Sequence, residues 1–330
     1  MNNNKMKITI PYYEDNTRIS NSAIGWFIKY GPAYLKDMLD GKEEGINGEF
    51  LKKGTMIHEY LLQPDEFWED YNIIGTARPR SKQQKDFCDY YLNSTEIEPD
   101  KQILQAYKKA FSNNKTDKQV LDEGKVILEN NADYLTYLAS KDNNKTEITF
   151  NDLNMLKAIK ENMQNHKKAN ELMFNLPNTF ECHNEFQINW ESKEGIKCKS
   201  LLDRVCFDYT NKKVILIDLK TTQSVYQFKH SIEEYDYFRQ IAFYGLAITW
   251  YLTNIVEVDP EEFDFEAYII VIDKTKRNEI KVVNMKVPTQ IDLAINRIKE
   301  SLQKISKHIN TNQWKYSLEY EDGNGVEELY

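Results

Sequence analysis

A predicted hairpin near the middle of the sequence most constrains what this chain can fold into. The run Val214 to Leu219 is apolar and rich in β-branched residues, as in a buried strand, and a polar turn around Asn211 precedes it. Because side chains alternate along a strand, Asp218 and Lys220 share one face. A turn at Asn211 brings Asp203 within cross-strand reach of both. The sequence therefore predicts two carboxylates and an amine in one pocket.

Such a pocket suits metal-assisted hydrolysis of a phosphate ester. Clustered oxygen ligands are what a magnesium ion requires, and a neighbouring lysine can orient or deprotonate the attacking water and offset charge in the transition state. The alternative is a structural ion pair between Asp203 and Lys220, with Asp218 merely ending a strand. The tripeptide Asp-x-Lys is common, so by itself it favours this alternative.

Two further segments carry polar residues in a pattern that narrows the choice. Gln240 and Tyr244 are four residues apart in the apolar stretch Phe238 to Tyr251, which is typical of a helix, and so they share one helical face. His58 lies far upstream on another short helix, which we expect to stop near Pro64.

Taken in order, these residues resemble a known family. His58, Asp203, Asp218-x-Lys220 and Gln240-x-x-x-Tyr244 resemble the PD-(D/E)xK nuclease superfamily, and within it the RecE-type (exodeoxyribonuclease VIII-like) exonucleases and their phage relatives. The likeness covers roughly residues 19 to 315, and it includes the runs Ile19 to Ser22, Gly54 to Phe67, Cys198 to Asp203, and Tyr235 to Tyr244. One departure is Ser200-Leu201, where the family more often has a glycine–arginine or similar basic pair. In this chain Lys197 and Lys199 could make the phosphate contact that such a pair provides.

The resemblance implies a fold and an activity. The fold is an α/β, restriction-endonuclease-like core with a mixed central sheet flanked by helices and a helical N-terminal half. The activity is that of a Mg2+- or Mn2+-dependent exodeoxyribonuclease that resects linear double-stranded DNA from 5′ ends for single-strand-annealing recombination. Its implied partners are double-stranded DNA ends and a RecT-like single-strand annealing protein, and a ring-shaped homo-oligomer is also implied.

The resemblance also assigns roles to residues. The metal ligands would be His58, Asp203, Asp218 and the carbonyl of Leu219, and Lys220 would position and activate water. Gln240 and Tyr244 would contact DNA or orient the catalytic groups. Two alternatives remain: a structure-specific or defence-associated endonuclease of the same superfamily, and a catalytically idle DNA-end-binding protein. The intact acid, acid and lysine set argues against the idle binder.

Three candidates have a structural interpretation beside the functional one. His58 shares a helical face with Leu61 and Leu62 and could be a core histidine. Glu185, in the strand before the hairpin, is either an additional metal-site acid or an exposed strand glutamate. Tyr244 could simply pack in the core with its hydroxyl bonded to the backbone.

The charge of the chain is unfavourable for a DNA enzyme. The formal net charge is −9, whereas duplex binding depends on neutralising phosphates. One segment of the chain is nevertheless basic, and we expect it either to bind DNA phosphates or to be a solvated helix start. Its DNA-binding candidates are Arg78, Arg80, Lys82 and Lys85.

Length and composition bound the remaining possibilities. At 330 residues with 41% hydrophobic content, the chain can bury a sizeable core, and we expect one undivided nuclease domain. Within it, residues 1–175 are mainly helical, 176–288 form the catalytic αβ core, and 289–330 form a helix and an acidic tail. We expect helices at 19–40, 50–67, 82–93, 99–112, 117–140, 151–174 and 289–310, and strands at 180–190, 266–273 and 280–287 beside the hairpin.

The sequence also predicts several absences. It contains no apolar run of transmembrane length and no signal peptide, so we expect a cytoplasmic protein with no membrane partner. The glycines lack phosphate-loop spacing, which argues against ATP-driven translocation. The four cysteines form no Cys-x-x-Cys pair, so we expect reduced thiols and neither zinc nor an iron–sulfur cluster.

Overall fold

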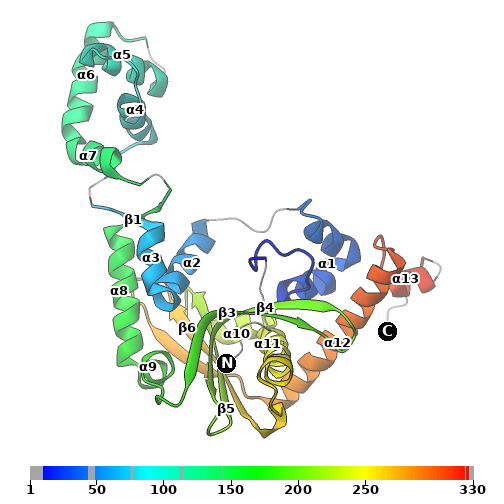
Figure 1. Ribbon diagram of the computed structural model, residues 1–330. Helices are drawn as coiled ribbons and strands as arrows, with labels where there is room; N and C mark the ends of the chain where they lie inside the picture. Colours follow the sequence, from blue (N-terminus) through cyan, green and yellow to red (C-terminus); the bar gives the residue numbers. More distant parts are fainter. Residues whose placement is uncertain are drawn as a thin grey trace. The chain divides into compact units, whose positions relative to one another are not determined.

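The chain divides into two compact units. The computed structural model describes residues 10–43, 49–75, 78–111, 114–142, 144–323 and 325–326. One unit combines Met1–Gln63 with Ala158–Tyr330, and the other is Pro64–Lys157. The first contains a five-stranded sheet and the second is mostly helical (Figure 1). Our expectation of one undivided domain concerns independent folding and stays a prediction.

The five-stranded sheet is mixed, as expected. Its strands lie in the order β3 (Glu181–Glu191), β4 (Lys197–Asp208), β5 (Lys213–Thr222), β6 (Asp264–Asp273) and β7 (Ile280–Asn284). Neighbouring strands are antiparallel except for β5 and β6, which are parallel. Strand β5 is central, and six consecutive residues from Val214 to Leu219 are buried, which explains their apolar character.

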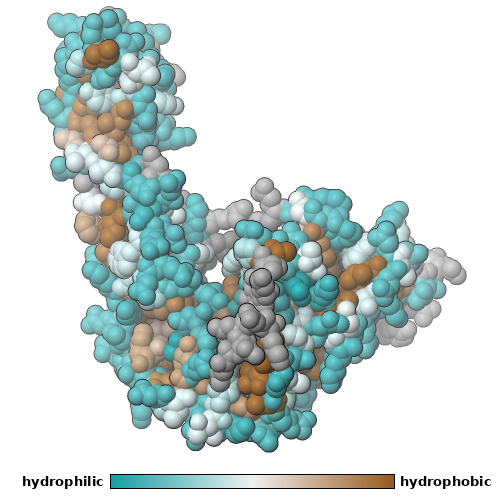
Figure 2. Space-filling model, in the orientation of Figure 1, coloured by the Kyte–Doolittle hydropathy of each residue, from teal (hydrophilic) through white to brown (hydrophobic). Residues whose placement is uncertain are grey.

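Helices of the first unit pack against this sheet to form the main core. The core joins apolar side chains of β4, β5 and β6 to those of α1 (Asn21–Leu39), α11 (Tyr237–Tyr251) and α12 (Pro288–Thr311). Helix α2 (Glu49–Leu62) contacts β4 and β5. Ser20 caps α1 by accepting a hydrogen bond from the Ala23 amide, and Gly31 kinks this helix with φ of 84° just before Pro32. Figure 2 shows a largely hydrophilic face on this unit with separate apolar patches.

Smaller elements complete the first unit. They are α9 (Lys167–Phe174), α10 (Phe228–Glu234), a π-helical turn (Leu252–Val256), a 3-10 turn (Pro260–Glu262) and α13 (Leu318–Asp322). No helix within the described ranges is both long and apolar enough to cross a membrane.

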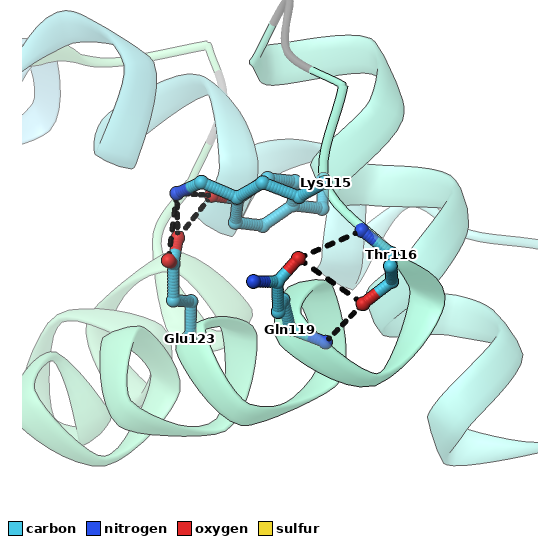
Figure 3. A network of polar contacts seen from close by, with 5 residues as sticks. Lys115, Thr116, Gln119 and Glu123 are labelled. Carbon is cyan, nitrogen blue, oxygen red and sulfur yellow. Dashed lines mark hydrogen bonds and ion pairs between the residues drawn. The ribbon is translucent and has the colours of Figure 1, made fainter.

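The second unit has its own core. It contains α3 (Pro64–Asp70), α4 (Lys82–Leu92), α5 (Pro99–Ala110), α6 (Asp117–Asn130) and α7 (Ala132–Ser140), with a parallel pair of short strands, β1 (Tyr71–Ile74) and β2 (Thr146–Thr149). Helix α8 (Phe150–Asn165) spans the boundary of the two units. Phe87, Tyr107 and Tyr134 are among the buried core residues. Thr116 and Gln119 form a capping box that begins α6, beside the Lys115–Glu123 ion pair (Figure 3).

Three predicted helices are in fact pairs of helices. The helix expected at 50–67 breaks at Gln63, before Pro64; the one at 117–140 breaks at Asn131; and the one at 151–174 breaks at His166. A proline disfavours helix in the residue before it, and His166 caps α9 by accepting a hydrogen bond from the Ala169 amide. The short strands β1 and β2 and helix α10 were not predicted.

The expectation of four reduced thiols is wrong for one pair. Cys182 and Cys206 lie directly opposite each other on β3 and β4 and form a disulfide. They are 24 residues apart in the chain, and only the strand register brings them together. Cys88 and Cys198 are buried free thiols, and burial raises the pKa of Cys88 to about 11.

Candidate active site

The candidate site lies where β4 and β5 stop pairing. Their ladder ends at Arg204 opposite Ile217, whereas β5 continues to pair with β6 as far as Thr222. At the end of the β4–β5 ladder, the Leu219 amide donates a 2.6 Å hydrogen bond to Asp203 Oδ2. A side-chain carboxylate thus replaces a strand carbonyl, and the two strands separate at the carboxylates of Asp203 and Asp218.

The predicted face of β5 is present. Lys220 Nζ lies 2.6 Å from Asp218 Oδ2, and Asp218 is 1% exposed. Gln240 Nε2, on α11, donates to Asp218 Oδ1 at 2.9 Å and to the Tyr244 hydroxyl at 3.0 Å. The structure therefore brings together the Asp-x-Lys motif and the glutamine–tyrosine pair, which the sequence separates by 20 residues.

A second cluster adjoins this one. His58 Nδ1 lies 3.7 Å from Asp203 Oδ2, and one donor atom each from His58, Glu185 and Asp203 lie within 4.8 Å of one another. The His58 ring also hydrogen-bonds to the backbone of Leu219. The backbone of Leu219 thus bonds to both Asp203 and His58. The expected role of the Leu219 carbonyl as a metal ligand stays a prediction.

Glu185 reaches this cluster from an unusual backbone conformation. Its neighbours Asn184 and Phe186 pair with Arg204 and Leu202, so Glu185 lies opposite Asp203. Its φ is +46°, which is rare for a residue other than glycine and costs about 1–3 kcal/mol. Such strain in mid-strand is found at functional sites more often than elsewhere.

These residues fit a divalent cation. Two carboxylates and an imidazole supply oxygen and nitrogen donors at separations that one ion can bridge. Asp218 Oδ2 adds a buried oxygen that makes no hydrogen bond of good geometry with the described residues, although the Lys220 ammonium lies beside it.

Burial controls the charges of the site. It raises the pKa of Asp218 to about 6, against the opposing effect of Lys220, and it raises the pKa of Asp203. Burial also lowers the pKa of His58 to about 4, with help from Lys220. For Lys220 the effect of burial is outweighed by Asp218 and Asp203, so its pKa is raised. At neutral pH the imidazole is neutral and able to bind metal, and the lysine is an ammonium.

Lys220 has one neighbour, Tyr237, that was not predicted as a site residue. The Tyr237 ring lies 5.3 Å from Lys220 Nζ, in a cation–π arrangement. Tyr237 is the first residue of α11, three positions before Gln240, so the helical face that carries Gln240 was the available clue.

The basic segment belongs to the second unit and makes its contacts there. Arg78 pairs with Glu147 at 3.4 Å, and Glu147 also pairs with Lys141 at 2.7 Å. The Arg80 amide donates to Gln84 at the start of α4, which contains Lys82 and Lys85. The DNA-binding role of these four basic residues stays a prediction.

The mixed sheet, the separated strands and the acid, acid and lysine set define a PD-(D/E)xK-type α/β protein. Residues 20–320 match the family described as "PDDEXK-like domain of unknown function". The chain belongs to this family, which confirms the predicted superfamily and fold class.

A solved structure supports the fold. The crystal structure of a protein from Eubacterium rectale, described as a "Putative exonuclease", is similar to this chain with a TM-score of 0.52. The match covers 98% of this chain and 95% of that one at 13% sequence identity, so it concerns the fold alone. No curated protein matches the sequence.

Proposed function

We propose that this protein is a metal-dependent deoxyribonuclease that hydrolyses phosphodiester bonds of linear double-stranded DNA. The observation that carries the proposal is the meeting of Asp203, Asp218 and Lys220 where β4 and β5 separate. His58 and Glu185 complete a donor set for a divalent cation beside them. A purely structural ion pair would not require the strained Glu185 backbone or the surplus of buried carboxylate.

The roles of the residues follow from their charges. A bound Mg2+ or Mn2+ would supply Lewis-acid stabilisation of the phosphate and a more acidic water, held by Asp203, His58, Glu185 and Asp218. Lys220 is an ammonium, so it donates hydrogen bonds that orient the water and offset phosphate charge. Gln240 fixes the Asp218 carboxylate through its amide, and Tyr244 fixes Gln240.

We further propose exonuclease action from 5′ ends. The description of the Eubacterium rectale protein supports an exonuclease, and the resemblance of His58 through Tyr244 to RecE-type enzymes supports the 5′-to-3′ direction. A RecT-like annealing protein as partner and a ring-shaped homo-oligomer are proposals with the same basis.

Linear duplex DNA labelled at either end, with a circular duplex as control, tests this function. We expect loss of the 5′ label from linear DNA in Mg2+ or Mn2+, and no cleavage in EDTA. In Ca2+ we expect binding with little turnover, because calcium's looser coordination positions water poorly. Nicking of the circle would indicate an endonuclease. Full activity after exhaustive chelation would exclude the metal mechanism.

A further inference from the structure

A recess in the first unit is lined by residues at the start of β7, and one of them, Lys281, is on the same face of the sheet as Lys220. Lys220 of β5 pairs with Val271 of β6, and Val271 pairs with Lys281 of β7. Paired residues on neighbouring strands point to the same face. At about 4.8 Å per strand, Lys281 lies about 10 Å from Lys220 along this row.

The recess has the volume of a ligand site. It measures about 540 Å3 and is lined by Tyr226, His166, Arg277 and Lys281, together with Asn162, Asn165, Val225, Glu279 and Ile280. Ligand pockets typically measure about 300–1,000 Å3. The lining thus offers two basic side chains, a histidine, one carboxylate and an aromatic ring.

The aromatic ring is poised for stacking. Tyr226 is 70% exposed, although its neighbour Val225 is 5% exposed and packs in the core. Tyr226 follows β5 by four residues, after a turn in which the Ser224 amide donates to the Thr222 hydroxyl. The buried Val225 anchors the backbone next to Tyr226, and the exposure of the Tyr226 ring leaves it accessible to a stacking partner.

Hydrogen bonds hold the backbone that carries Arg277, and the Lys281 ammonium contacts a backbone carbonyl. Asn162 donates to the carbonyls of Arg277 and Asn278, and Asn278 adopts φ of +51°, which an asparagine tolerates in a turn. Lys281 Nζ approaches the Val225 carbonyl at 3.4 Å. The segment 274–281 carries four basic residues and one acid, against a chain whose net charge is −9.

We propose that this recess binds single-stranded DNA, with a base stacked on Tyr226 and backbone phosphates on Arg277 and Lys281. Stacking on an exposed aromatic ring beside a cationic groove is how proteins hold single strands without reading their sequence. A base inside a duplex is already stacked on both of its faces, so an unpaired base is the one that offers a free face to the Tyr226 ring. The DNA strand in the recess is therefore one that has separated from the duplex near the row of paired residues Lys220, Val271 and Lys281. The identity of the ligand as DNA rests on the proposed function.

The binding test uses the full chain and a short fluorescent oligothymidylate in Ca2+. Tyr226→Leu should weaken binding about tenfold, the typical effect of losing one base–aromatic stack. Arg277→Gln and Lys281→Gln should each lower the slope of log affinity against log salt by about 0.7, since each removes one phosphate contact to a single strand. Tyr30→Leu and Lys299→Gln are matched controls on α1 and α12, where Tyr30 is 53% exposed and Lys299 is exposed.

A second readout reports stacking directly. An oligonucleotide with 2-aminopurine at successive positions should show one position quenched by the parent protein and not by Tyr226→Leu. Unchanged affinity, salt slope and quenching in all three recess variants would overturn the proposal. An equal loss of affinity for blunt duplex and single strand would also overturn it, in favour of a duplex backbone contact.

Single-strand binding in the recess and nuclease activity can be tested independently of each other. If the parent cleaves DNA and the recess variants keep its KM on partly single-stranded substrates, the recess proposal fails and the nuclease stands. If the parent cleaves nothing in Mg2+ or Mn2+ but binds single strands through Tyr226, the nuclease fails and the recess stands.

Discussion

Residue-scale chemistry centres on the Asp218–Lys220 pair. We expect Lys220→Ala to abolish cleavage with little effect on DNA binding, because the ammonium acts on the transition state more than on bound substrate. The variant leaves Asp218 buried without its cation, so its fold must be checked by circular dichroism. Lys213→Ala, at the other end of β5 and paired with Glu266, is the matched control. Cleavage by Lys220→Ala within a factor of a few of the parent would contradict the role.

A second residue-scale prediction concerns His58 in metal-free protein. Burial lowers its pKa from 6.5 to about 4, so between these pH values the folded state binds fewer protons than the unfolded state. Its contribution to the free energy of unfolding is present above pH 6.5 and is lost as pH falls toward 4. We therefore compare the free energies of unfolding of the parent and His58→Gln in EDTA. The parent's value minus the variant's should fall by about 1–2 kcal/mol from pH 7 to pH 5, allowing for the partly exposed ring.

Urea unfolding at the two pH values measures this gap. Asp218, whose raised pKa acts in the opposite direction, is present in both proteins and largely cancels in the comparison. A gap of equal size at pH 7 and pH 5 would show that His58 does not titrate as described.

Helix packing at the element scale depends on one glycine of the second unit. A Cβ on Gly124 of α6 would lie 2.3 Å from Ile103 Cγ2 of α5. Overpacking of this kind costs about 1–3 kcal/mol, against a gain in helix propensity of about 1 kcal/mol. We expect Gly124→Ala to speed hydrogen exchange across α5 and α6. Gly245→Ala is the control: its Cβ would lie 3.9 Å from Phe265 Cζ, an ordinary contact, so its hydrogen exchange should not change. Equal hydrogen-exchange protection of α5 and α6 in Gly124→Ala and the parent would refute the close approach of the two helices.

Apolar periodicity located almost every large element but not the breaks between them. The predicted strands at 180–190 and 266–273 and the helix at 289–310 agree with β3, β6 and α12 within two residues. The helix breaks at Asn131 and His166 were not predicted, because the apolar pattern continues across them. Each break occupies a single residue whose side chain hydrogen-bonds to the backbone. Asn131, for example, donates its side-chain amide to the Ile127 carbonyl.

The net charge of the whole chain, −9, is unfavourable for binding the proposed DNA substrate. Arg78 is already paired with Glu147, so Arg80 is the better candidate for a DNA phosphate. We expect Arg80→Ala to lower the slope of log affinity for duplex against log salt by about one unit, and Arg78→Ala to change it less. Salt titrations of the parent and both variants measure this. Identical slopes in all three would remove the segment from DNA binding.

Those parts of the site that depend on local geometry could be predicted from the sequence. Strand alternation placed Asp218 and Lys220 on one face, the turn before β5 brought Asp203 back to them, and helical spacing aligned Gln240 with Tyr244. These relations hold in any fold that contains the hairpin and the helix, because covalent geometry fixes which neighbours share a face.

Which distant segments meet depends on the tertiary structure and could not be predicted from local patterns. The approach of α2 brings His58 to Asp203. The β3 register brings Glu185 and Cys182 opposite Asp203 and Cys206. The pairing of β5, β6 and β7 places Lys281 two strands away from Lys220, on the same face of the sheet. The tertiary structure also assigned the basic segment to the second unit. Such contacts follow from how apolar faces pack and from the register in which strands pair, and no local pattern of residues encodes either.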